Sequence, residues 1–177
     1  MFFFRKKDKK DNESAGSNLE SAAAFMQKGD ECTRRHDFAE AEKWYLKSLS
    51  VLEPLSQQDK SNRTRRLLSR TYSMLSVLGR AVTDEKKRRE AADWLKKSLE
   101  IDEKLAAQAG TAEAYDDLAC SYSGLGGLAL DVSYNEKALA IWRDLHRKYP
   151  NEPLYEKRIE DEQYNIGKLK EYLSRKK

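Results

Sequence analysis

Apolar residues recur every three to four positions from Leu19 onward, and the strict apolar–polar alternation that is typical of strands is absent. Polar turns, prolines or glycines interrupt this pattern at six places. At one of them, Gly110 is suited to end a helix and Thr111 to cap the next. Because the connections are short, we expect successive helices to be antiparallel neighbours. The pattern predicts an all-α chain with helices at roughly 19–35, 38–57, 61–83, 88–109, 112–131, 135–148 and 153–174.

One apolar pattern is repeated along the chain. The nonamer AEKWYLKSL (41–49) returns fifty residues later as AADWLKKSL (91–99), with Ala, Trp, Lys, Ser and Leu kept in place. The same offset pairs TYSML (71–75) with SYSGL (121–125), and a third copy follows in KALAIWRDL (137–145). A chance similarity between Leu- and Ala-rich helices would not keep Trp, Ser-Leu and Tyr in register. We therefore predict a repeat protein, in which stacked helix pairs bury apolar stripes that no pair could bury alone.

The repeated unit resembles the tetratricopeptide repeat, a pair of antiparallel helices with small residues where they cross. The interval of 47–50 residues, together with the run Asp117-Leu118…Ser121-Tyr122, is similar to long-repeat bacterial variants. The resemblance implies a right-handed α-solenoid of about three repeats, closed by a C-terminal capping helix that contains Tyr164, Ile166 and Gly167. The matching residues are Phe25, Gly29, Cys32, Phe38, Ala41, Tyr45, Ser48, Leu49 and Pro54; then Tyr72, Leu75, Ser76, Ala91, Leu95, Ser98 and Leu99; then Tyr122, Leu125, Gly126, Ala129, Ala138, Trp142, Leu145 and Pro150.

Two alignments of the second copy are possible, and we favour the first. The register of Tyr72 puts Ser76 at the crossing position and leaves about three extra residues in the turn that follows. The alternative puts Leu78-Gly79 at the family's Leu-Gly position.

Small residues and tryptophans define the packing that we expect. A Gly inside a helix costs ~1 kcal/mol relative to Ala, so close packing must offset that cost. The residues expected at the close crossings are Gly29, Ser76, Gly126 and Gly167. Those expected to fill the space between repeats are Trp44, Trp94 and Trp142.

The composition is consistent with a helical repeat protein, and the cysteines indicate the cellular compartment. Of 177 residues, 39% are hydrophobic and 36% charged, which suits a thin helical core with a charged exterior. Residues 1–18 have no sustained period, so we expect a disordered leader before a repeat domain at 19–177. Cys32 and Cys120 have no framework spacing and are expected to be free thiols, which indicates a reducing compartment and a cytoplasmic protein. No apolar run approaches the length of a membrane span.

No motif predicts catalysis, a metal or a cofactor. Cys32 and His36 have the spacing of two metal ligands, but no second Cys/His pair completes a site. SGLGG (123–127) follows no strand and precedes no Gly-Lys-Ser/Thr, so we interpret it as helix packing. Carboxylates at 116–117 and 160–162 are expected on solvated faces, and KKRR (86–89) in a solvated turn. A net charge of +4, without a broad basic face, argues against nucleic-acid binding.

The resemblance implies a concave groove, lined by the first helix of each repeat, that binds a segment of another protein. Arg70 and Arg80 are the candidate anchors for an acidic group, because a guanidinium forms paired hydrogen bonds with a carboxylate. The clamp with which one subclass grips chaperone tails is absent here, so we expect no such binding. The positions that would line the groove are Ala23, Met26, Asp30 and Thr33; Arg70, Ser73, Val77 and Arg80; and Cys120, Ser123, Gly127 and Leu130.

These observations favour a non-catalytic adaptor that binds a partner protein or peptide in the groove. The alternative is a membrane-peripheral tether, in which the three Phe of MFFFRKKDKK insert at the interface while its five bases meet anionic headgroups. A third hypothesis is self-association through an end of the array. The charged last helix argues against it, so we expect a monomer.

Overall fold

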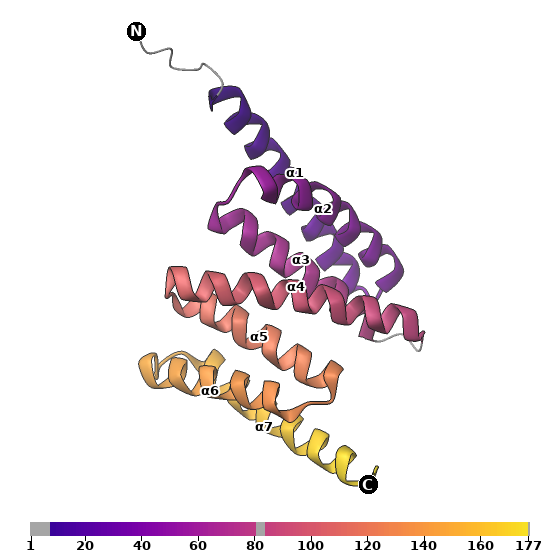
Figure 1. Cartoon of the computed structure of the whole chain (residues 1–177), viewed down its shortest axis with the longest axis vertical. Coiled ribbons are helices and arrows are strands. Elements are labelled where there is room, and N and C mark those ends of the chain that lie inside the picture. The colour runs from indigo at the N-terminus through magenta and orange to yellow at the C-terminus, as the bar shows by residue number, and fades with distance from the viewer. Residues whose placement is uncertain (1–7, 81–83, 177) are drawn as a thin grey trace. The chain divides into compact units, whose positions relative to one another are not determined.

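The computed structural model describes residues 8–80 and 84–176. Within these ranges it contains seven α-helices and no strand (Figure 1). The predicted all-α repeat architecture is confirmed, whereas the right-handedness of the solenoid stays a prediction. The helices are α1 (Asp8–Arg34), α2 (Phe38–Gln58), α3 (Asn62–Arg80), α4 (Glu85–Ala109), α5 (Ala112–Ala129), α6 (Val132–Lys148) and α7 (Pro153–Ser174).

The first helix begins earlier than predicted. It starts at Asp8 instead of residue 19, so residues 8–18 of the expected disordered leader are helical. That segment contains no proline, and lengthening an existing helix is far easier than nucleating a new one. Residues 1–7 lie outside the described residues, and the boundary between a leader and a repeat domain at residue 18 stays a prediction.

Aspartate caps explain two further boundary corrections. The Asp84 side chain accepts hydrogen bonds from the backbone N–H groups of Lys86 and Lys87, so KKRR, predicted as a turn, lies at the start of α4. Asp131 caps α6 in the same way through the N–H of Ser133, which starts that helix at Val132. Gly110, in the left-handed conformation with φ 62°, ends α4 as predicted.

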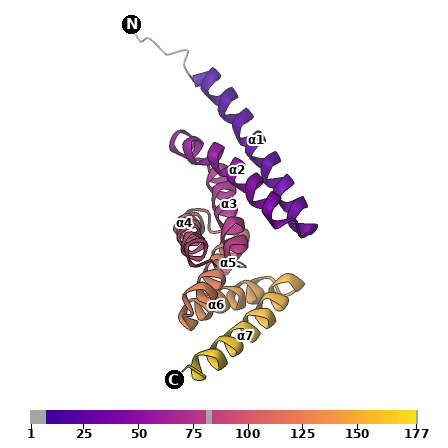
Figure 2. The ribbon, with the colours of Figure 1, turned by 90° about the vertical axis from the view of Figure 1, so that its right-hand side faces the viewer.

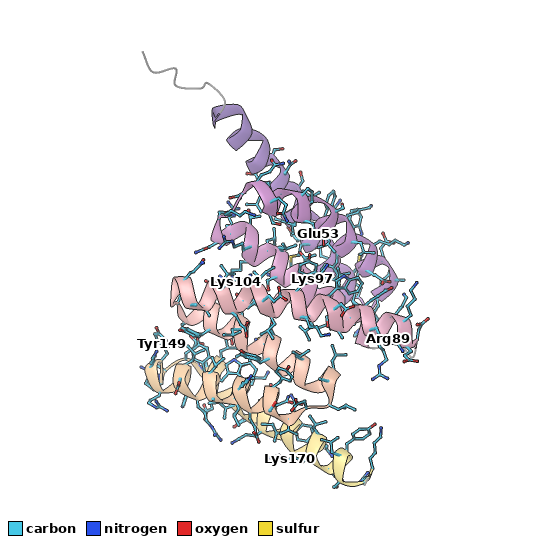
Figure 3. All side chains as sticks on the ribbon, viewed as in Figure 1. Glu53, Arg89, Lys97, Lys104, Tyr149 and Lys170 are labelled. Carbon is cyan, nitrogen blue, oxygen red and sulfur yellow. The ribbon has the colours of Figure 1, made fainter. Side chains whose placement is uncertain are left out.

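The chain divides into two compact units, residues 1–75 and 76–177, with the boundary inside α3. In the first unit, α1 and α2 pack as an antiparallel pair (Figure 1). In the second unit, α4 packs on α5, α5 on α6 and α6 on α7, and α7 also touches α5 (Figure 2). Lys170 of α7, labelled in Figure 3, pairs with Glu136 of α6, with 3.2 Å between the lysine Nζ and the glutamate Oε1.

Glycines mark the points where paired helices approach most closely. A Cβ placed on Gly29 would lie 2.5 Å from the Tyr45 ring, and one on Gly126 would lie 2.5 Å from Asn135 Cγ. Both expected crossings are therefore confirmed. In the second copy the close approach is at Gly79, where a Cβ would lie 2.8 Å from the Ala91 Cβ. Ser76, one turn earlier on the same side of α3, is also buried, with 1% of its surface exposed.

The expected crossing at Gly167 is wrong. A Cβ on Gly167 would meet no atom within 4 Å, and the residue is exposed. The reason is that α7 packs on α6 and α5 with its other side, through Tyr155, Glu162, Ile166 and Leu169.

Hydrogen bonds between helices of successive pairs recur at the offset of fifty residues. In each unit two buried hydroxyl groups face each other, and a tyrosine on the later helix donates to a glutamate on the earlier one. The pairs are Ser48–Thr71 (3.4 Å) and Tyr72–Glu53 (2.6 Å) in the first unit, and Ser98–Ser121 (3.1 Å) and Tyr122–Glu103 (2.8 Å) in the second. The repeat inferred from the sequence is therefore also a repeat of contacts.

The tryptophans do not share one role. Trp142 is buried against Ala119 of α5 and Tyr155 of α7, as expected for a residue between repeats. Trp44 instead lies half-buried within the α1–α2 pair, stacked on Phe25 with 5.8 Å between ring centroids. Trp94 is also half-buried. The buried counterparts of Trp142 are Tyr45 and Leu95, each one position after the repeated tryptophan.

The crossing glycines give a prediction in which one substitution has opposite effects at two sites. We expect Gly126→Ala to lower the free energy of unfolding by about 1–3 kcal/mol, because the new methyl group displaces Asn135 from its hydrogen bond. Gly167→Ala meets no atom and should raise that free energy by about 0.5–1 kcal/mol through helix propensity. Urea unfolding followed by circular dichroism measures both, and equal effects would show that Gly126 is no packing constraint.

Candidate partner-binding surface

In the first unit, two of the predicted lining residues pair with each other. The Arg70 guanidinium lies 2.8 Å from Asp30 Oδ2, and Asp30 also accepts a 2.7 Å hydrogen bond from the Tyr45 hydroxyl. The Arg70 side chain is 59% exposed, so this ion pair contributes only ~0–1 kcal/mol to stability. It still means that a partner carboxylate must compete with Asp30 for Arg70.

The other lining residues of the first unit are less open than the predicted groove requires. Met26 is 2% exposed, and the Thr71 hydroxyl lies 3.6 Å from its sulfur, so no partner can reach it. The Thr33 hydroxyl donates a 2.9 Å hydrogen bond to the Gly29 carbonyl. The half-buried lining positions of this unit are Ala23, Asp30, Thr33 and Ser73.

In the second unit, the predicted residues on α5 follow one side of the helix and become more exposed toward its end. Cys120 and Ser123 are half-buried, whereas Gly127 is exposed and Leu130 is 37% exposed. The Ser123 hydroxyl donates a 2.6 Å hydrogen bond to Glu162 of α7. Thus α7 covers the middle of this side of α5 and leaves its C-terminal end open. On α3, Val77 is 41% exposed, and the side chain of Arg80 lies outside what the structure describes.

Glu162 is a buried carboxylate and not the solvated residue that we expected. It is 1% exposed and accepts hydrogen bonds from Ser123 Oγ at 2.6 Å, Asn135 Nδ2 at 2.7 Å and Asn165 Nδ2 at 3.2 Å. A buried charge is tolerated when donors surround it, and these donors come from α5, α6 and α7 itself. Glu162 therefore fastens α7 to both preceding helices.

A second buried carboxylate, Asp102, was missed. It is 2% exposed and accepts hydrogen bonds from Ser121 at 2.6 Å and from Ser98 at 3.3 Å. Its position gave a signal, because Asp102 falls four residues after Ser98 and three before Leu105, on the apolar stripe of α4. An acid on a buried stripe indicates a polar link to a neighbouring helix.

An ion pair between Asp116 and Arg158 lies near the N-terminal end of α5, on the side that carries Cys120 and Ser123. Asp116 Oδ1 accepts a 2.7 Å hydrogen bond from the Trp142 indole, and the Nε of Arg158 lies 3.7 Å from the same oxygen. The Arg158 guanidinium also lies 5.7 Å from the centroid of the Trp142 ring. The Asp116 and Arg158 side chains are 18% and 39% exposed. Sequence reasoning did not single out Arg158.

These helices are the part of the chain that matches a known family. Residues 111–146 match the family described as tetratricopeptide repeat. This segment of the chain is a tetratricopeptide repeat. The matched segment runs from the cap of α5 to the last turn of α6, which is the third copy. No curated protein matches the chain. Tetratricopeptide repeats typically bind other proteins or peptides and are typically non-catalytic.

The thiols of Cys32 and Cys120 are free, as predicted. Burial, together with the nearby carboxylate of Asp116, raises the pKa of the Cys120 thiol to about 12. That thiol is therefore protonated and unreactive near neutral pH. Cys32 is buried, His36 is exposed, and the described ranges hold no cluster of three metal-ligating side chains.

Membrane contact through residues 1–10 stays a prediction, since residues 1–7 fall outside the described part. No helix among the described residues is long and apolar enough to cross a bilayer.

The buried carboxylate of Glu162 on α7 gives a stability prediction. Glu162→Gln replaces one acceptor oxygen by an amide that faces other donors, so the free energy of unfolding should fall by about 1–3 kcal/mol. Glu160→Gln, on the exposed side of the same helix, removes the same charge and should have little effect. Thermal unfolding of the two variants tests this, and a stable Glu162→Gln protein would contradict the buried network.

Tyr45 gives a pH prediction. Burial, reinforced by the Asp30 carboxylate, raises the pKa of its hydroxyl from 10.0 to about 12. Folding therefore favours the neutral phenol, so this stabilisation is fully present below about pH 10 and is lost as the pH rises toward about 12. Urea unfolding across that window should show a smaller alkaline loss of stability in Tyr45→Phe than in wild type. Tyr164→Phe, at a site 66% exposed, serves as the control and should follow wild type.

Proposed function

We propose that this protein is a non-catalytic adaptor that holds a segment of a partner protein against the open side of α5. The observation that carries the proposal is the match of α5 and α6 to the tetratricopeptide repeat, a module that typically binds proteins or peptides. Of the predicted lining positions on α5, Gly127 and Leu130 are exposed, which supports contact with a partner at this end of the helix.

Because Gly127 has no side chain, nothing projects from the α5 backbone at this position. A glycine at an exposed helical position costs stability, and no Cβ fills the space beside Leu130 and Ser123. A partner main chain can therefore approach the α5 backbone there more closely than at any larger residue. The proposal assigns contact to Gly127 and Leu130, and leaves Ser123 to its hydrogen bond with Glu162.

The remaining predicted positions enter the proposal with smaller roles. On α3, Ser73 of the first unit and Val77 of the second each stay a proposed contact, and the proposed contact at Arg80 falls on a side chain outside the described residues. Arg70 takes part only where a partner carboxylate displaces Asp30 from its 2.8 Å ion pair. A monomeric, cytoplasmic adaptor is the form that we propose.

The test is a chemical-crosslinking pull-down from native lysate with a matched pair of variants. Gly127→Glu places a long charged side chain on the proposed surface, whereas Ala129→Glu places the same side chain on an exposed position that points about 200° away around α5. We expect a protein that is captured by wild type and Ala129→Glu, and lost with Gly127→Glu. The purified partner should then bind Gly127→Glu about tenfold or more weakly in calorimetry, because the added charge is desolvated on binding. Identical captures by the two variants would remove the proposed surface.

A further inference from the structure

The charge pair at the N-terminal end of the same side of α5 has unused hydrogen-bonding groups. Asp116 lies four residues before Cys120 and eleven before Gly127, so it shares their side of the helix. Its Oδ1 is used by the Trp142 indole, and its Oδ2 has no partner among the described residues. The Nε–H of Arg158 is buried without a hydrogen-bond partner, which leaves the terminal amino groups as the accessible donors of this half-exposed side chain.

Asp116 therefore offers a hydrogen-bond acceptor beside the donors of Arg158, and the two side chains together carry no net charge. An incoming carboxylate would gain from Arg158 but would bring its oxygens against Asp116. It would also approach α5, whose charged residues are all acidic: Glu113, Asp116 and Asp117. A neutral group that both donates and accepts satisfies the two side chains at once. One residue of an extended chain is such a group, because its N–H and C=O point to the same side, as in an antiparallel ladder.

We propose that Asp116 and Arg158 bind the main chain of an extended partner segment, with Asp116 accepting the N–H and Arg158 donating to the C=O of one residue. This inference rests on the proposed function and specifies how the partner is held. Asp116 and Gly127 are about 16 Å apart along the helix, a distance that about five extended residues span. The partner segment thus runs along α5, anchored by its backbone at Asp116 and packed on the glycine surface near Leu130.

The experiment is an NMR titration of the full chain, followed on the Trp142 indole N–H and the Arg158 Nε–H signals. The probe is a pentaalanine peptide blocked as N-acetyl and N-methylamide, which offers main-chain groups and almost no side chain. Propionamide stands for an Asn or Gln side chain, and sodium acetate for a carboxylate. The variants are Asp116→Asn, which keeps an acceptor for Trp142, and Arg158→Lys, which keeps the charge. Arg143→Lys, at an exposed position of α6, is the matched control.

We expect the pentaalanine peptide to shift both signals saturably in wild type and in Arg143→Lys. Asp116→Asn and Arg158→Lys should each bind it about tenfold more weakly, the loss typical of one charge-assisted hydrogen bond. Asp116→Asn should also begin to bind acetate, because the repelling oxygen has become a donor.

Several results would overturn the inference. It fails if acetate or propionamide saturates the wild-type site more tightly than the peptide, if the peptide shifts neither signal, or if both variants bind it as wild type does. The proposed function is judged separately, by the protein lost with Gly127→Glu. If Asp116→Asn and Arg158→Lys still capture that protein, the adaptor surface stands and the main-chain contact falls.

Discussion

The missing side chains at Gly29, Gly79 and Gly126 set how closely the helices of each pair approach. At Gly126 the consequence reaches furthest, because Asn135 occupies the space that a Cβ would fill. From that position its amide donates a 2.7 Å hydrogen bond to Glu162, whose other oxygen accepts from Ser123 and Asn165. The attachment of α7 to α5 and α6 therefore depends on the absence of a side chain at Gly126 of α5.

Some of the predicted lining residues hold neighbouring helices together, whereas others can contact a partner. Ser123 is committed to Glu162, and Asp30 is committed to Tyr45 and Arg70. These groups link helices of successive pairs, so a partner could use them only by breaking the fold's own contacts. Two features remain that a partner can bind: the exposed backbone at Gly127, and the ion pair of Asp116 with Arg158, which carries no net charge. Such a surface favours shape and main-chain hydrogen bonds over charge.

The apolar period was enough to predict the helices, because it depends only on residues within one helix. The crossing glycines were predictable where a partner helix follows, and failed at Gly167, where α7 packs through its other side. The second copy was ambiguous because Ser76 and Gly79 are three residues apart and lie on one side of α3. Polar partners were not predictable, since Asp30 and Arg70 are separated by 40 positions and Ser123 and Glu162 by 39. An acid on an apolar stripe, such as Asp102, indicates burial, but the sequence does not show which residue of another helix it meets.

Packing in sequence order has a kinetic consequence. Each helix of the second unit packs chiefly on its neighbour along the chain, so few contacts require distant segments to meet. A topology of low contact order folds quickly, because little loop-closure entropy is lost before contacts form. The same locality lets a terminal helix detach without unfolding the others. On a ribosome, α5 and α6 could close into a hairpin before the residues that bury their far side, those of α7, had been synthesised.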